Sequence, residues 1–169
     1  MYKRQALLWA DRPADSLPGA LWRLYALRAG IRRQSDLIAR AFDAGRHRAP
    51  VYEAVAGVAD PPGPVEVRAV ADAVLAGAFT GDLGVALERA AAFCRVVSTG
   101  WALLADELVD VHSVDGGGAR GEPTLSLVRG PTDDPSDAAA LLTRRASDLL
   151  RTGGQLEAAA RRWREGTLH

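Results

Sequence analysis

The strongest pattern in this chain is a run of apolar residues over 83–108 that are alternately four and three residues apart. This heptad spacing keeps the apolar side chains on one side of an α-helix of about 26 residues, roughly 39 Å long. A stripe of that length has to be buried by other helices, so it predicts the central helix of a helical bundle. The stripe, called the seam below, consists of Leu83, Leu87, Ala90, Cys94, Val97, Trp101, Leu104 and Leu108.

Two helices are predicted before residue 51. Ser16 can cap a helix over 16–30, and Pro18 fits its first turn, where a missing N–H does no harm. A second helix over 33–44 has an apolar face and a glycine, Gly45, at its end. The first helix either stops at Gly30 or continues through it into the second.

Four further helices are predicted. A short one over 51–58 ends in a proline-rich break, and a longer one follows over 64–80. Pro135 opens a helix that has Leu150 on its buried side and ends at Gly153–Gly154, and a last helix covers 155–164. With the seam, these segments predict an all-α, single-domain bundle of about five to seven helices over residues 1–169.

The helical pattern fades after the seam. Apolar and polar residues alternate over 109–113 and again over 124–128, on either side of a glycine-rich stretch at 115–121. The span 109–128 is therefore either one small β-hairpin packed on the helices or an irregular loop. The glycine spacing matches neither common phosphate-binding loop, so we expect a flexible connection there.

The amino-acid composition indicates the cellular compartment in which the protein works. Cys94 is the only cysteine, so no intramolecular disulfide can form, which fits a reducing environment. No apolar run reaches the roughly 20 residues of a membrane span, and the apolar patch after Arg4 is too short for a signal peptide. We therefore expect a cytoplasmic protein that does not enter a membrane. Lys3 is the only lysine among 21 basic residues, a bias typical of a GC-rich bacterial genome.

Charge is unevenly distributed along a chain whose formal net charge is zero. Residues 1–50 hold ten basic and four acidic side chains, whereas 51–137 hold five basic and fourteen acidic ones. Residues 138–169 are basic again, with six against three. The basic ends could pair with the acidic middle of the same chain or of a second copy, or face a polyanion.

A basic helical hairpin over 17–48 is the candidate nucleic-acid site. Residues 31–36 resemble the turn before a recognition helix, although Asp36 stands where that motif needs an apolar residue. A plain helical hairpin with solvated arginines is the alternative. The residues that would contact phosphates and bases are Arg28, Arg32, Arg33, Gln34, Arg40, Arg46 and Arg48.

No catalytic motif stands out. Cys94 lies on the seam, where a thiol packs and does not react. The acidic residues near His112 have no second histidine close in sequence, so no metal site and no cofactor are predicted. We expect a non-enzymatic interaction or assembly protein that binds a protein partner or forms a homodimer. The alternative is a nucleic-acid-binding regulator that uses the 17–48 hairpin.

Overall fold

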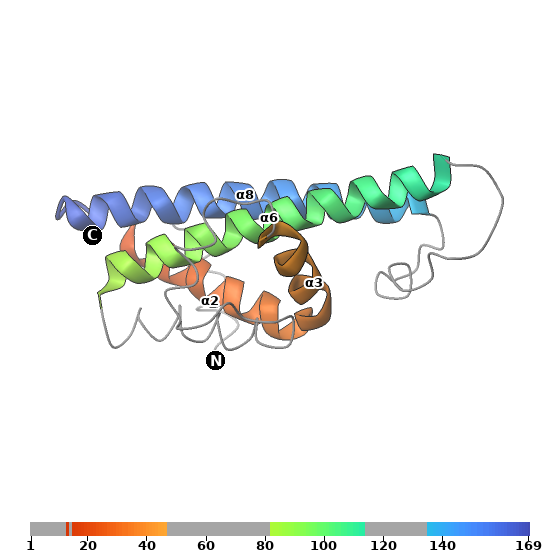
Figure 1. Ribbon diagram of the computed structural model, residues 1–169. Helices are drawn as coiled ribbons and strands as arrows, with labels where there is room; N and C mark the ends of the chain where they lie inside the picture. Colours follow the sequence, from red (N-terminus) through yellow and green to blue (C-terminus); the bar gives the residue numbers. More distant parts are fainter. Residues whose placement is uncertain (1–12, 14, 47–81, 114–134) are drawn as a thin grey trace.

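A computed structural model describes residues 13, 15–46, 82–113 and 135–169. In this part of the chain every regular element is an α-helix: α2 (Leu17–Arg33), α3 (Ser35–Arg46), α6 (Leu83–Ser113) and α8 (Pro135–Arg164). Figure 1 shows α6 and α8 side by side and antiparallel, with α2 and α3 on one side of that pair. The prediction of an all-helical fold is thus confirmed for the described residues.

The seam lies on α6 as predicted. All eight of its residues are buried, and Leu87, Ala90, Cys94 and Val97 are fully so. They are buried because α8 packs along α6 from one side and α3 packs against it from another. A helix enclosed by two neighbours also buries residues beside the seam, including Phe93.

Both alternatives predicted for 109–113, a first hairpin strand and an irregular loop, are wrong, because α6 continues to Ser113. Val109 is 55% exposed and Asp110 is exposed beside it. Adjacent residues can share the outer side of a helix, whereas a strand would turn one of them inward. The remainder of that prediction, including the glycine-rich stretch at 115–121 and the strand at 124–128, lies outside the described residues.

α3 and α6 cross with their backbones in contact, and glycine makes this possible. A Cβ atom on Gly100 would lie 1.5 Å from the Ala41 carbonyl oxygen. A Cβ atom on Gly45 would lie 1.9 Å from the Val96 carbonyl oxygen. Gly45 is therefore part of a helix contact and does not end the helix, which runs on to Arg46.

α6 and α8 also approach closely, which corrects the predicted helix end at Gly153 and Gly154. Both glycines lie inside the 30-residue helix α8. Gly153 is buried, and a Cβ atom there would lie 3.1 Å from the Cys94 Cβ atom. The Ser98 hydroxyl adds a buried hydrogen bond of 2.7 Å to the carbonyl oxygen of Ala146.

Leu150 does not lie on the buried side of α8, where the sequence pattern placed it. Its side chain is 55% exposed. α8 packs against the core through Leu142, Ala146 and Leu156, which are buried. Leu149 is partly buried against the same core. Leu150 lies about 100° further round the helix than Leu149, which turns its side chain away from the core.

The first and last described segments meet. Ser16 caps α2, its hydroxyl accepting from the Gly19 amide at 3.2 Å. The backbone amide of Leu17, the first residue of α2, donates to the carbonyl oxygen of His169 at 2.9 Å. The chain can turn back to α2 because Gly166, at a φ of 68°, ends α8.

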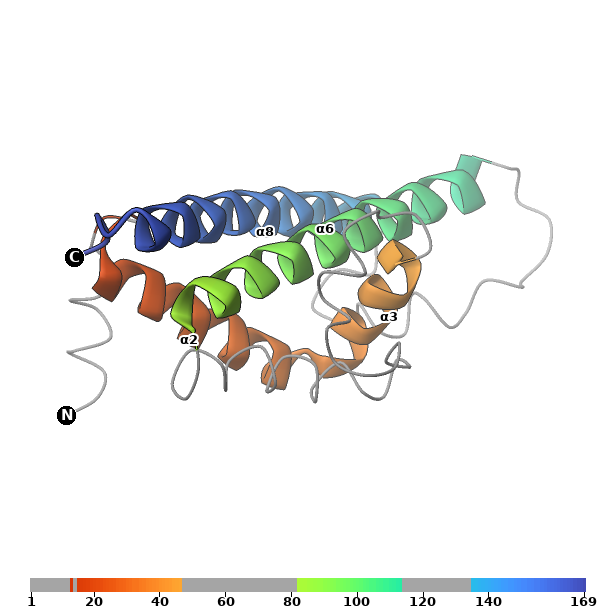
Figure 2. The same cartoon turned by 60° about the vertical axis from the view of Figure 1, so that its left-hand side comes forward.

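α2 continues through Gly30, and the break between α2 and α3 comes at Gln34. α2 begins at its contact with the C-terminal segment. From there it runs antiparallel to α8 and diverges from α8 toward α3 (Figure 2). The helices predicted over 51–58 and 64–80 lie outside the described residues. Among the helices that are described, none combines the length and hydropathy of a membrane-spanning segment.

A glycine in a tight helix contact and a glycine with open space around it should respond in opposite ways to substitution by alanine. Gly100→Ala should destabilise the protein by about 1–3 kcal/mol or more, because the new methyl group forces α3 away from α6. Gly154→Ala should stabilise it by about 0.5–1 kcal/mol, since nothing lies within 4 Å of a Cβ atom there. Urea unfolding followed by circular dichroism measures both. Equal effects of the two variants would contradict the α3–α6 contact.

Candidate functional site

A groove lies between α2 and the α6–α8 pair. It encloses about 440 Å³ and is lined by residues of all four described helices. It exists because α2 is joined to α8 by polar side chains at two separate points. The Arg23 Nε atom donates to Gln155 Oε1 at 2.7 Å, and the Arg145 Nη1 atom donates to Gln34 Oε1 at 2.6 Å.

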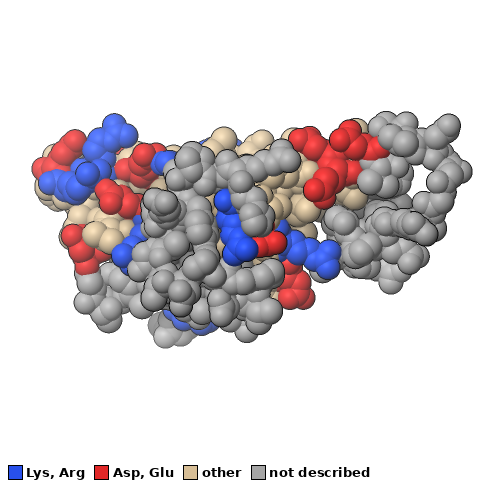
Figure 3. All heavy atoms as spheres, in the orientation of Figure 1, with Lys and Arg blue, Asp and Glu red and all other residues tan. Residues whose placement is uncertain are grey.

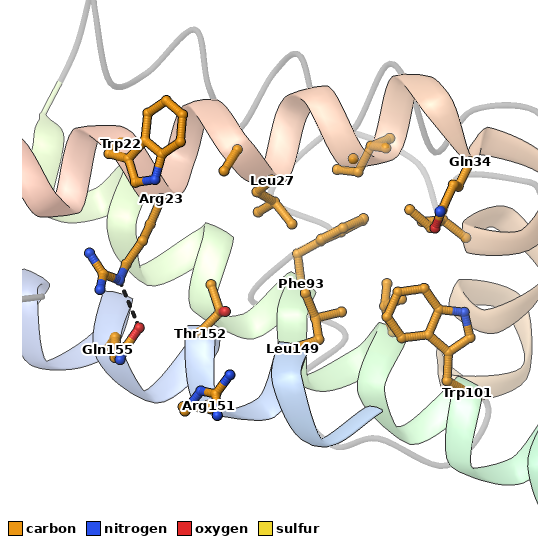
Figure 4. A pocket seen from close by; sticks show the side chains of 15 residues that line it. Trp22, Arg23, Leu27, Gln34, Phe93, Trp101, Leu149, Arg151, Thr152 and Gln155 are labelled. Carbon is orange, nitrogen blue, oxygen red and sulfur yellow. Dashed lines mark hydrogen bonds between the residues drawn. The ribbon is translucent and has the colours of Figure 1, made fainter. Parts of the chain in front are cut away.

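These two contacts, called the bridges below, define the length of the groove. Arg23 lies on α2 and Gln34 caps its end, eleven residues later, which corresponds to roughly 16 Å along a helix. Between them the walls are mixed, with apolar side chains from three helices beside Arg151 and Thr152 of α8 (Figure 4). Leu27 and Ile31 come from α2, Phe93 and Val97 from α6, and Leu149 from α8.

Aromatic side chains stand at both ends of the groove. Trp22 lies at the Arg23 end, where its ring centroid is 5.7 Å from that of Tyr25. Trp101 lies at the other end, near Gln34 (Figure 4). Phe93 lines the groove between them and stacks on Phe42, with ring centroids 5.5 Å apart. This contact holds the Phe93 ring in place.

The indole of Trp101 is only 6% exposed, and its Nε1 atom has no hydrogen-bond partner in the part of the chain that the structure describes. An indole N–H is a donor only, and a buried donor without an acceptor is costly. Such groups are rare in folded proteins unless a bound molecule or water satisfies them. The Nε1 atom has almost no exposed surface, so an acceptor in the groove does not reach it, and Trp101 lines the groove with its other atoms.

Arg23 is the second polar group of interest in the groove. Its Nη1 atom donates to the Gly19 carbonyl oxygen at 2.9 Å, and its Nε atom forms the first bridge. Both acceptors are neutral, and no carboxylate of the described residues pairs with it. Burial without a compensating negative charge lowers the pKa of Arg23.

The remaining polar residues of the groove are satisfied within α8. Arg151 is 70% exposed and pairs with Asp148 at 2.7 Å. The Thr152 hydroxyl donates to the carbonyl oxygen of Asp148 at 3.0 Å. The described lining contains no acidic side chain, so the fixed charges of the groove are positive.

The candidate nucleic-acid residues occupy different surroundings. Arg32, Arg33, Gln34 and Arg40 are exposed, Arg28 and Arg46 are half-buried, and Arg48 lies outside the described residues. Arg46 pairs with Asp43 at 3.2 Å, and Gln34 is held in a bridge.

The face drawn in Figure 3 has basic and acidic side chains interspersed, with acidic ones gathered over the C-terminal part of α6. The connection between α2 and α3 is the single residue Gln34, shorter than the turn expected over 31–36. The first turn of α3 also carries Asp36, whose charge disfavours a phosphate. Nucleic-acid binding by the 17–48 hairpin stays a prediction.

Cys94 has the surroundings of a packing residue. It is fully buried on α6, and burial raises the pKa of its thiol to about 12 despite the opposing charge of Arg95. A thiol that stays protonated is a poor nucleophile and a poor metal ligand. Among the described residues, no three histidine, cysteine, aspartate or glutamate side chains come together to hold a metal ion.

Comparison of the chain with family models, curated proteins and solved structures gave no match. Sequence reasoning identified Trp101 only as a seam residue and did not single out Arg23 or Gln155. The position of Arg23 offered one indication of its partial burial. It directly precedes the buried Leu24 on a helix, so its side chain starts near the core. The pairing with Gln155, 132 residues away, has no local signature.

The buried thiol leads to a pH prediction. Above about pH 8.5 the unfolded chain loses the Cys94 proton, whereas the native state keeps it up to about 12. The native state then binds more protons, so the free energy of unfolding should fall as pH rises from 8.5, by up to about 1.4 kcal/mol per pH unit. Urea unfolding at pH 8 to 10 measures this slope. Cys94→Ala should be less sensitive to pH by that amount, and identical slopes would contradict the burial of the thiol.

Proposed function

We propose that this chain is a non-enzymatic binding protein that holds a small, mostly apolar molecule in the groove between α2, α6 and α8. The observation that carries the proposal is a groove in which aromatic and aliphatic side chains surround the partly buried guanidinium of Arg23, whose hydrogen bonds go only to neutral acceptors. Small-molecule sites typically combine an apolar lining with a few fixed polar groups in about 300–1,000 Å³. The volume of about 440 Å³ lies in that range.

The shape of the groove favours a small molecule over a folded partner. A stable protein–protein interface buries about 1,200–2,000 Å² and needs a broad face on each partner. This groove is bounded by a bridge at each end, roughly 16 Å apart along α2. The predicted protein partner and homodimer would use other surfaces, and both stay predictions.

The lining chemistry suits retention of a ligand. Phe93, Leu27 and Leu149 offer apolar contact, while Arg23 and Gln155 offer polar groups held in place by their hydrogen bond. Guanidinium groups remain protonated at neutral pH, so Arg23 would orient a ligand and would not exchange protons with it. These are the features of a binding site that positions one end of a molecule.

Filling the groove should abolish binding without harming the fold. Gly30 lines the groove, and nothing lies within 4 Å of a Cβ atom built there. Gly30→Leu should therefore place its side chain in the groove and weaken binding of the neutral dye Nile red at least tenfold. The measurement is the blue shift and increase of dye emission on titration with protein.

Gly154→Leu is the matched control for that experiment. Gly154 is also helical with open space around it, but it is exposed on α8 and does not line the groove. This variant should bind Nile red as the unmodified protein does. The proposed function is contradicted if the unmodified protein does not bind the dye, or if Gly30→Leu binds it equally well.

A further inference from the structure

We infer that the groove selects an organic anion, a carboxylate or a sulfonate, over a neutral molecule of the same shape. This inference rests on the proposed function and adds the chemical class of the ligand. It follows from the way in which the arginines of the two bridges are paired, and it assigns no particular orientation to the ligand.

The arginines of the bridges are paired differently from other arginines at helix contacts. Each bridge ends on the neutral side-chain amide of a glutamine. A glutamine oxygen accepts a hydrogen bond as a carboxylate does, but it brings no negative charge. Three other arginines that lie against a neighbouring helix or segment each meet a carboxylate: Arg95 meets Glu157, Arg162 meets Asp15, and Arg164 meets Glu88. The bridges therefore join α2 to α8 and leave their arginines unneutralised.

The guanidinium of Arg23 stands in the wall of the groove (Figure 4). Its side chain is half-buried, and its Nε and Nη1 atoms donate to Gln155 and to the Gly19 carbonyl oxygen. The Nη2 atom takes part in neither bond. A half-buried cation is stabilised when an anion pairs with it, and the planar guanidinium is well suited to carboxylate and sulfonate oxygens.

Arg145 adds positive charge at the opposite end of the groove. It does not line the groove, but it is bonded to Gln34, which does. Among the described residues no carboxylate pairs with it. Its charge therefore acts on a ligand through the electrostatic field, and both ends of the groove favour a negative charge.

The other lining residues do not offset these charges. A third arginine, Arg151, pairs with Asp148 at 2.7 Å, which cancels its charge. Gln34, Thr152 and Gln155 are polar but neutral, and no acidic side chain lines the groove among the described residues. The unneutralised arginines of the bridges therefore dominate the potential in the groove, and this potential attracts an anion.

Two dyes with the same ring system test the charge preference. 8-Anilinonaphthalene-1-sulfonate carries a sulfonate, and N-phenyl-1-naphthylamine is the same molecule without it. Titration of each dye with protein, followed by its fluorescence, gives a dissociation constant. The constant of the neutral dye divided by that of the anionic dye, called the charge ratio below, measures the preference. Gly30→Leu should weaken the binding of both dyes, which places them in the groove.

Gln155→Glu is the decisive variant. It replaces the amide of the first bridge with a carboxylate of nearly the same shape, so the bridge can form while Arg23 is neutralised. The charge ratio should fall about threefold or more, because the neutralised guanidinium no longer attracts the sulfonate. Gln34→Glu should lower the ratio less, since Arg145 lies outside the lining and solvent ions screen its charge.

Arg23→Gln reaches the same end by a second route. It removes the charge of Arg23 and should lower the charge ratio by about as much as Gln155→Glu does. Thermal unfolding shows whether each variant is folded. Arg23→Gln keeps the test decisive if Gln155→Glu is not folded.

Arg161→Gln is the matched control for net charge. It changes the charge of the protein by the same amount as Gln155→Glu, and Arg161 is an exposed residue of α8 that does not line the groove. The charge ratio should stay at the value of the unmodified protein. An equal fall in Arg161→Gln would show that the overall charge sets the preference, and it would overturn the inference.

The outcomes separate the inference from the proposed function. If Nile red binds and Gly30→Leu blocks it, but Gln155→Glu and Arg23→Gln keep the charge ratio, the groove binds small molecules and the inferred anion is wrong. The inference is also overturned if the unmodified protein binds the neutral dye more tightly than the anionic one. If none of the dyes binds, the proposed function itself fails, and the inference fails with it.

Discussion

The backbone contact between α3 and α6 determines where α3 lies on α6 and, through α3, where the far end of α2 lies. Ala41 and Gly45 of α3 meet Val96 and Gly100 of α6 with no side chain between them. Such a contact gains dispersion energy from many atoms at short range, but a single methyl group is enough to disrupt it. Because α3 is fixed in this way, the far end of α2 is fixed too, since only Gln34 separates the two helices.

The groove follows from the attachment of α2 at its two ends. At one end the Leu17 amide bonds to His169 and Arg23 bonds to Gln155, and at the other α3 packs on α6 while Arg145 bonds to Gln34. Between these points α2 cannot move onto the α6–α8 pair without breaking one set of contacts. A groove held open in this way is preorganised for a ligand, which lowers the cost of ordering on binding.

The sequence predicted the elements better than it predicted their contacts. The seam was recognisable because heptad spacing over 83–108 has one physical explanation, and the α2 start was recognisable from Ser16 and Pro18. Glycine was misinterpreted, because Gly45 and Gly153 serve close helix contacts here, whereas the same residue often ends a helix. The groove could not be predicted, since it depends on Arg23 meeting Gln155 and on Arg145 meeting Gln34, residues more than 100 positions apart in the chain.

Nuclear magnetic resonance of the tryptophan indole groups would test the central claim most directly. With ¹⁵N-labelled tryptophan, the Trp101 Nε1–H signal can be assigned by its loss in Trp101→Phe, and the Trp163 signal in the same way. On titration with Nile red the Trp101 signal should shift and saturate, because its ring lines the groove, while the Trp163 signal stays in place. A Trp101 signal that does not move, or that moves only together with Trp163, would contradict a ligand held in the groove.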